Sequence, residues 1–125
     1  MTQRVYIDTS VIGGMFDEEF QVFTKLFFGR VFRKEIRLIT SDLLEGELVN
    51  APERVSEFYW SLPKEQCEFV KATTESDGLA EQYIAEKVVG LTSLAACQHI
   101  AIATLNKADV LVSWNFQHIV NLRKD

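Results

Sequence analysis

The chain has 125 residues, a formal net charge of −5 and a sequence pI near 5.0, and 47% of its residues are hydrophobic. This length and composition predict one globular domain spanning residues 1–125. No stretch approaches the roughly 18 apolar residues of a membrane span, and a strand pattern begins almost at once, so we expect no signal peptide and a cytoplasmic protein. The acidic balance disfavours nucleic-acid binding by bulk electrostatics. Because Cys67 and Cys97 form no Cys-x-x-Cys pair, buried thiols are favoured over a zinc site or disulfide.

The first predicted element is a short buried strand that leads into a carboxylate. Residues 4–11 read Arg-Val-Tyr-Ile-Asp-Thr-Ser-Val, so the strand residues end at Asp8 and two hydroxyls follow. Ligands of parallel α/β sheets bind just outside the carboxyl ends of the strands, which makes Asp8 a candidate site residue. An Asp at this point can equally cap a following helix. From this stretch alone, both interpretations remain open.

A phenylalanine-rich segment follows. Four phenylalanines recur at intervals of four, three and four residues, which predicts one packing face of a helix: Phe16, Phe20, Phe23 and Phe27. Basic residues gather towards the end of the same segment: Lys25, Arg30, Arg33, Lys34 and Arg37. The simplest interpretation is a solvated helix face. Contact with RNA phosphates or with an acidic partner segment is the alternative.

The second predicted strand covers residues 36–40, and a helix opens after it. Asp42 and Glu45 have the spacing of a capping box, which is a sufficient structural explanation for Glu45. Glu47 lies about 200° from Glu45 around the helix axis, on the apolar side. An inward acid there needs a partner, and a metal ion is one candidate.

The remaining pattern continues the alternation of strands and helices. We expect strands at residues 68–72 and 109–113 and helices at residues 50–61, 75–88, 91–105 and 117–122. His99 lies in the near-continuous apolar helix, where a hydrogen-bonded core histidine is favoured over a ligand or base. Alternation of this kind predicts an α/β fold with a parallel sheet of about four strands flanked by helices.

Three stretches of this pattern resemble a known family. They are residues 6–10 (Tyr-Ile-Asp-Thr-Ser), residues 41–48 (Ser-Asp-Leu-Leu-Glu-Gly-Glu-Leu) and residues 99–120, from His-Ile-Ala-Ile-Ala-Thr to Trp-Asn-Phe-Gln-His-Ile-Val. With them the chain resembles a PIN domain of the VapC type, the toxin of bacterial toxin–antitoxin pairs. The resemblance implies a three-layer PIN-like sandwich, an RNA substrate, a cognate antitoxin partner and a Mg²⁺- or Mn²⁺-dependent ribonuclease site.

Carried over residue by residue, the resemblance assigns Asp8 and Glu47 as catalytic metal ligands. Asn115 stands where many PIN domains have an acid, and it is assigned as a neutral contributor to the site. Thr9 and Ser113 are additional candidates.

The main departure from the family pattern is Ala96, which stands where an Asp is expected three residues before His99. An alanine methyl cannot ligate a cation, so two formal charges remain where the pattern would supply three or four. We therefore expect impaired metal binding and turnover. Ala96 can be natural or an engineered change, or another acid can replace the lost one. Asp77 and Asp109 are candidates for that role, although Asp109 is at the wrong end of its strand.

A second departure concerns the end of the chain. The family pattern predicts a fifth strand after residue 121, and we expect that strand to be missing here. The unpaired sheet edge would then favour a homodimer or a partner peptide.

Three functions compete on these observations. The first is a VapC-like endoribonuclease scaffold that hydrolyses RNA phosphodiester bonds and is impaired by Ala96. The second is a catalytically silent PIN-like module that binds an antitoxin or RNA. The third is a receiver-like domain phosphorylated at Asp8, which is disfavoured because residues 1–7 contain no acid to complete a Mg²⁺ site.

Overall fold

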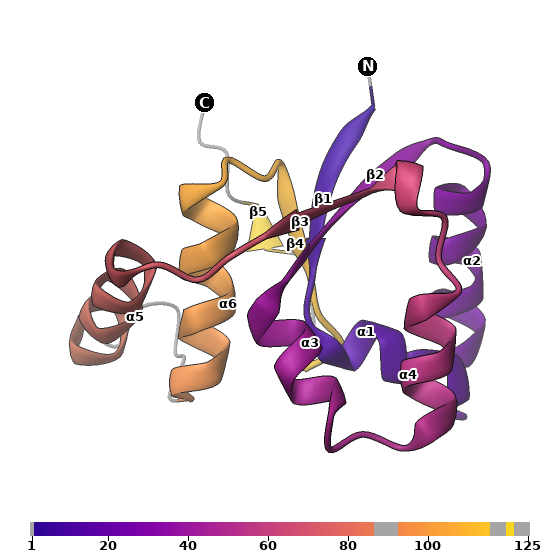
Figure 1. Ribbon diagram of the computed structural model, residues 1–125, viewed down its shortest axis with the longest axis horizontal. Coiled ribbons are helices and arrows are strands. Elements are labelled where there is room, and N and C mark those ends of the chain that lie inside the picture. The colour runs from indigo at the N-terminus through magenta and orange to yellow at the C-terminus, as the bar shows by residue number, and fades with distance from the viewer. Residues whose placement is uncertain (1, 87–92, 116–119, 122–125) are drawn as a thin grey trace.

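The computed structural model describes residues 2–86, 93–115 and 120–121, and its sheet lies between two layers of helices (Figure 1). The strands are β1 (Gln3–Ile7), β2 (Ile36–Ser41), β3 (Cys67–Val70), β4 (Val110–Val112) and β5 (Val120–Asn121). Their order in the sheet is β3-β2-β1-β4-β5. Because β3, β2, β1 and β4 pair in parallel, the predicted α/β fold with four parallel strands is confirmed.

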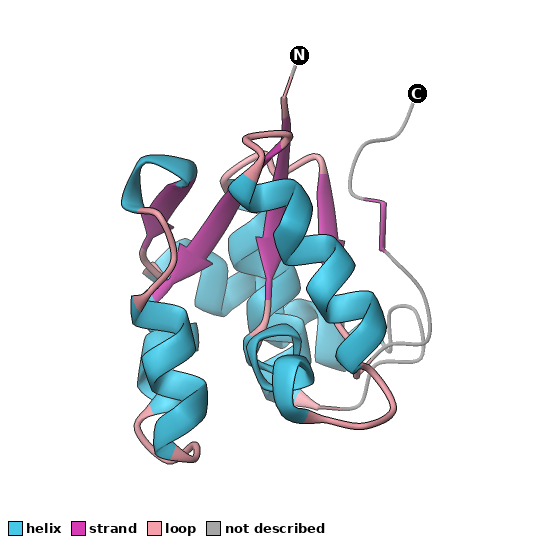
Figure 2. Cartoon of the chain, turned by 90° about the vertical axis from the view of Figure 1, so that its right-hand side faces the viewer, coloured by secondary structure: helices cyan, strands magenta, loops and turns pink. Residues whose placement is uncertain are grey.

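The helices lie on both faces of the sheet. Figure 2 shows the helices and the strands in different colours. The α-helices are α1 (Thr9–Gly13), α2 (Gln21–Phe32), α3 (Asp42–Leu48), α4 (Glu53–Trp60), α5 (Thr74–Glu86) and α6 (Leu94–Leu105). Two 3₁₀ turns complete the order: η1 (Gly14–Phe16) lies between α1 and α2, and η2 (Lys64–Gln66) lies between α4 and β3. In the described part of the chain, no helix has the length and apolar content to cross a membrane.

Both faces of the sheet are buried, since successive strand side chains point to opposite layers. Val5 and Ile7 of β1 pack in the core formed with α1, α2 and α4, whereas Tyr6 packs in the core against α6. In β2, Leu38 packs in the same core as Val5 and Ile7, and Ile39 packs in the same core as Tyr6. This burial explains why the strands read as continuous apolar runs.

The C-terminal end of the sheet differs from the prediction. Val120 and Asn121 form β5 and pair antiparallel with Leu111 and Val110 of β4. The expected absence of a fifth strand is therefore wrong, and so is the predicted final helix over these two residues; the rest of that helix lies outside the described residues. The free edge of β4 offers backbone N–H and C=O groups to a neighbouring strand. Pairing with them decides the conformation of residues 120–121 against the helical pattern of the local sequence.

The phenylalanine stripe is not the core face of α2. The helix begins only at Gln21, so Phe16 and Phe20 precede it, and Phe23 is 62% exposed. The residues that α2 buries are Thr24, Phe28 and Val31. Phe27 is partly buried beside them. The buried set has the helical spacing that was expected, but it lies one position later in the sequence than the phenylalanine stripe.

The start of α3 also departs from the predicted capping box. Ser41 is the N-cap, and its hydroxyl accepts a hydrogen bond from the Leu44 amide at 3.2 Å. Asp42 instead accepts from the Ala72 amide at 2.9 Å, which ties α3 to the segment after β3. Glu45 is bound by the Tyr59 hydroxyl at 2.6 Å. Its role is therefore tertiary and not a helix cap.

Candidate functional site

Asp8 lies at the carboxyl end of β1 and is both a helix cap and the centre of a hydrogen-bonded cluster. Its backbone is extended (φ −97°, ψ −179°), which lets its side chain cap α1 by accepting from the Ser10 amide at 3.1 Å. The Ser10 hydroxyl donates to the same oxygen, Oδ1, at 2.6 Å. The Ser113 hydroxyl donates to Oδ2 at 2.5 Å. Since Asp8 is only 5% exposed, these donors stabilise a carboxylate that is almost removed from water.

The segment after β4 closes over this cluster. The Trp114 amide donates to the Ser10 hydroxyl oxygen at 2.9 Å, and the Asn115 amide donates to Ser113 Oγ at 3.0 Å. Asp8 and its two serines therefore join the ends of β1 and β4. The Asn115 side chain is exposed, so this candidate lies at the rim of the site and contributes its backbone to the cluster.

The Trp114 side chain anchors this segment to α2. Its indole donates to Thr24 Oγ1 at 2.9 Å and stacks on Phe20 with ring centroids 5.6 Å apart. A Cβ at position 14 would lie 2.4 Å from Thr24 Oγ1 and 2.5 Å from the indole nitrogen, so this contact requires Gly14.

Glu47 forms the second half of the site. Its Oε1 accepts from the Thr9 hydroxyl at 2.5 Å and pairs with His99 Nε2 at 2.9 Å. The hydrogen bond from His99 holds the Glu47 pKa below its usual value, with a further contribution from Thr9 and against the opposing effect of burial. The sequence correctly placed Glu47 inward. Because Thr9 follows Asp8 directly, the two acids come to one edge of the sheet.

His99 belongs to a buried chain of polar groups. Its Nδ1 lies 2.6 Å from the Tyr6 hydroxyl, which lies 2.7 Å from the Ser41 hydroxyl. A neutral His99 protonated at Nε2 satisfies every group: Ser41 donates to Tyr6, Tyr6 to Nδ1, and Nε2 to Glu47. Burial raises the pKa of Tyr6, so the phenol keeps the proton that it donates. The predicted hydrogen-bonded core histidine is confirmed, and it also contacts the candidate site.

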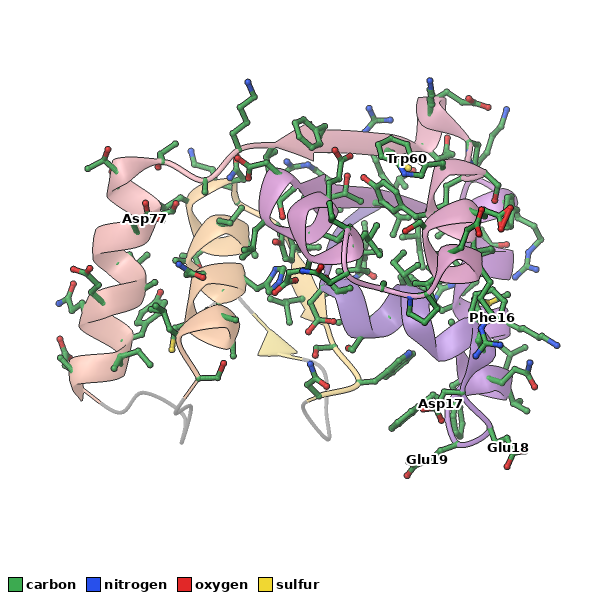
Figure 3. All side chains as sticks on the ribbon, turned by 60° about the horizontal axis from the view of Figure 1, so that its bottom comes forward. Phe16, Asp17, Glu18, Glu19, Trp60 and Asp77 are labelled. Carbon is green, nitrogen blue, oxygen red and sulfur yellow. The ribbon has the colours of Figure 1, made fainter. Side chains whose placement is uncertain are left out.

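The other candidate acids do not reach this edge. Asp109 precedes β4 and accepts from the Arg4 amide at 2.9 Å, which places it at the opposite end of the sheet, as expected. Asp77, which is labelled in Figure 3, is exposed on α5. Ala96 lies in the first turn of α6, half-buried, with its amide donating to Ser93 Oγ at 3.3 Å. Among the described residues, no third carboxylate joins Asp8 and Glu47 in a group that could hold a metal ion.

The donor set does not fit a resident divalent cation. Among the residues described, no three His, Cys, Asp or Glu side chains gather in a geometry that could hold a metal ion. Both oxygens of Asp8 already accept from hydroxyls, and Glu47 Oε1 accepts from Thr9 and His99. Mg²⁺ and Mn²⁺ need several oxygen ligands, and here the protein's own donors occupy much of the coordinating capacity of two acids.

Sequence reasoning missed three contributors to the site, namely Ser10, Tyr6 and Ser41. Ser10 had a usable signal, since a hydroxyl two residues after a capping Asp commonly bonds back to it. The link from Tyr6 to Ser41 had no local signal, because the two residues are 35 positions apart.

Comparison with known proteins supports the fold but not a closer relationship. No family model and no curated protein gives a significant match. Among solved structures, VapC20 of Mycobacterium tuberculosis, a sarcin-ricin loop cleaving toxin, matches with a TM-score of 0.66 and 12% identity over 88% of both chains. DNA-bound VapBC of Salmonella typhimurium matches with a TM-score of 0.60 and 16% identity, over 100% of this chain and 98% of that one. VapBC2 of Rickettsia felis, bound to a promoter DNA fragment, matches with a TM-score of 0.57 and 10% identity over 85% and 84%. The chain therefore has the PIN-like fold of the VapC toxins, as its sequence predicted.

Proposed function

We propose that this chain is a VapC-like module that binds RNA at the carboxyl edge of its sheet and has strongly reduced ribonuclease activity. The observation that carries the proposal is the pair Asp8 and Glu47, held at that edge in a VapC-like fold beside a helix that lacks the third acid at Ala96. VapC20, which shares the fold, is a toxin that cleaves the sarcin-ricin loop.

The position of Ala96 explains the expected loss. Ala96 precedes His99 by three residues on α6, and residues three apart are neighbours on one helix face. His99 contacts Glu47 directly, so a carboxylate at position 96 would point towards the same edge. We expect Mg²⁺ or Mn²⁺ to bind weakly to the present chain and more tightly once this acid is restored, because each carboxylate adds charge and an oxygen ligand.

Ala96→Asp tests the proposal directly. Thermal unfolding with and without Mn²⁺ should show little metal stabilisation of the present chain and an upward shift of several degrees for the variant. Cleavage of a structured RNA should rise in the variant by at least tenfold. Ala96→Asn is the matched control, since it adds the same bulk without the charge.

Two results would contradict this proposal in different ways. Robust metal-dependent cleavage by the present chain, abolished by Asp8→Ala, would show that Ala96 does not impair it. If Ala96→Asp folds but gains neither metal stabilisation nor cleavage, a ribonuclease scaffold is not supported and a silent binding module is favoured.

One further observation favours the binding alternative. The outer side of α2 exposes four large apolar side chains, with exposed fractions between 52% and 66%: Val22, Phe23, Leu26 and Phe32. The exposed cations Lys25, Arg30 and Arg33 lie among them. We call this set the α2 surface. Its mixture of apolar and basic groups suits an amphipathic acidic segment such as an antitoxin would offer, and two of the structural neighbours are VapBC complexes.

Co-expression with the product of the neighbouring reading frame tests this alternative. We expect a stable complex with the present chain and its loss in Leu26→Asp, whereas Glu57→Gln on α4 should leave it intact. Sedimentation at increasing protein concentration tests the predicted homodimer separately. A neighbouring product that binds neither the present chain nor Ala96→Asp would count against the α2 surface as an antitoxin site.

A further inference from the structure

A second concave site lies on the other side of α3 from Glu47. Glu45 and Glu47 are two residues apart, so their side chains point about 200° away from each other around the helix. Glu47 contacts α6, whereas Glu45 contacts α4 through Tyr59. The cavity at Glu45 has a volume of about 360 Å³ and is lined by Thr40, Glu45, Tyr59, Trp60, Leu62, Lys64, Cys67 and Phe69. This volume and mostly apolar lining are typical of a site for a small ligand.

The rim of this cavity presents two large aromatic side chains to solvent. Trp60 is 60% exposed and Phe69 is 49% exposed. Trp60 is labelled in Figure 3. Its ring packs edge-on against Tyr59, with centroids 4.9 Å apart, so one face of the indole is left for another partner. Exposed aromatic faces over an apolar cavity suit a flat ring that stacks on them.

The polar groups of the cavity are few and oriented. The Tyr59 hydroxyl donates to Glu45 Oε2 at 2.6 Å and lies 3.0 Å from Thr40 Oγ1. Burial raises the pKa of Tyr59, so it remains a donor and holds the carboxylate in place. No group in the described part of the chain donates to Oε1 of Glu45, which is left to accept from a ligand. Lys64 adds a positive charge to the same lining.

We propose that this cavity is a base-binding subsite of the module, and that it takes a guanine of single-stranded RNA. Guanine has two adjacent donors, N1–H and N2–H, which match the two oxygens of Glu45, because Oε2 has a second lone pair beside the one that accepts from Tyr59. The guanine ring would stack on Trp60 and Phe69. Adenine and cytosine each place a ring acceptor beside one amino donor, and uracil has a single ring donor. Lys64 would lie near the phosphate. This inference rests on the proposed RNA function and adds base preference to it.

The chain offers its own reporter for the test. Trp60 and Trp114 are its two tryptophans, one in this cavity and one beside Ser10. Guanosine monophosphate is titrated into the metal-free full chain while the two indole N–H signals are followed by NMR. We expect the Trp60 signal to shift and the Trp114 signal to stay, with adenosine monophosphate binding at least tenfold more weakly.

Two substitutions keep Trp60 as the reporter. Glu45→Gln preserves the shape and should weaken guanosine monophosphate binding about tenfold while reducing the preference over the adenine nucleotide. Phe69→Ala should weaken both nucleotides, since it removes a stacking surface. Glu57→Gln is the matched control, an exposed acid of α4 outside the cavity, and should bind as the present chain does.

Three results would overturn the proposed subsite. The first is that the Trp60 signal does not shift with guanosine monophosphate, and the second is that both nucleotides bind equally and still bind to Glu45→Gln. The third is that the Trp60 signal shifts with protein concentration alone, which would report contact with a second copy of the chain. The outcome is separable from the ribonuclease test. Cleavage gained by Ala96→Asp without guanosine monophosphate binding rejects only the subsite, whereas binding without gained cleavage rejects only the ribonuclease scaffold.

Discussion

The two acids of the candidate site lie at the same sheet edge but are held in different ways. Asp8 is buried and bound by neutral donors, the hydroxyls of Ser10 and Ser113 and one backbone amide. The Glu47 side chain is 33% exposed and is paired with the ionisable side chain of His99. Asp8 therefore joins two strand ends as a structural anchor, whereas Glu47 links the site to the buried hydrogen-bond network of His99. Substitutions at these two positions should therefore have different effects.

The largest effect is expected from removing the anchor. Asp8→Ala leaves three donors without their acceptor in a buried position, so we expect the free energy of unfolding to fall by about 3 kcal/mol in urea denaturation. Ser10→Ala removes one of these donors and also the acceptor of the Trp114 amide, so it should cost about 1–2 kcal/mol. If Asp8→Ala is as stable as the present chain, Asp8 is not a structural anchor, and the two acids do not differ in their structural role.

A smaller effect is expected in the buried network behind Glu47. Tyr6→Phe removes the hydroxyl that lies between His99 Nδ1 and Ser41 Oγ, so both groups lose a buried partner. We expect a loss of about 1–2 kcal/mol in the free energy of unfolding. Tyr83→Phe, in the partly buried contact of α5 with α6, should stay within about 0.5 kcal/mol. Equal values for the two variants would mean that the network does not stabilise the fold.

The charge of Glu47 should appear in the pH dependence of stability. Its pKa is lowered in the folded chain, so its contribution is present above the usual value of 4.5 and is lost as the pH falls through the lower folded value. In Glu47→Gln the stability should therefore fall less steeply below pH 4.5. The hydrogen bond with Arg4 also lowers the pKa of Glu68. The pH dependence of stability that comes from Glu68 therefore remains in the variant. Identical acid limbs for both proteins would contradict the pairing with His99.

The smallest effect is expected from Asp77. Because it is exposed on α5, Asp77→Ala should change the free energy of unfolding by less than about 0.5 kcal/mol. Asp77→Ala alone should show the same metal response as the present chain, and Asp77→Ala combined with Ala96→Asp should show the same response as Ala96→Asp. A loss of the metal response gained by Ala96→Asp would instead show that Asp77 takes part in the site in solution.

Much of the fold was accessible from local patterns, and much of the site was not. The strand ending at Asp8 and the inward position of Glu47 follow from periodicity, and both are seen in the structure. The phenylalanine stripe failed because two of its members precede α2 and because spacing alone does not say which face of a helix packs on the sheet. Glu45 was explained as a cap, yet its partner is Tyr59, 14 residues further along the chain.

The sequence by itself determined the alternation of strands and helices, the place of Asp8 at a strand end, and the lack of an acid at position 96. Tertiary structure alone decided that Ser113, 105 residues from Asp8, donates to its carboxylate, and that β5 covers the edge of β4. The reason is physical: periodicity reports which face of an element is apolar, whereas the partner of a buried polar group depends on strand order and register. Those are set by how the whole chain packs.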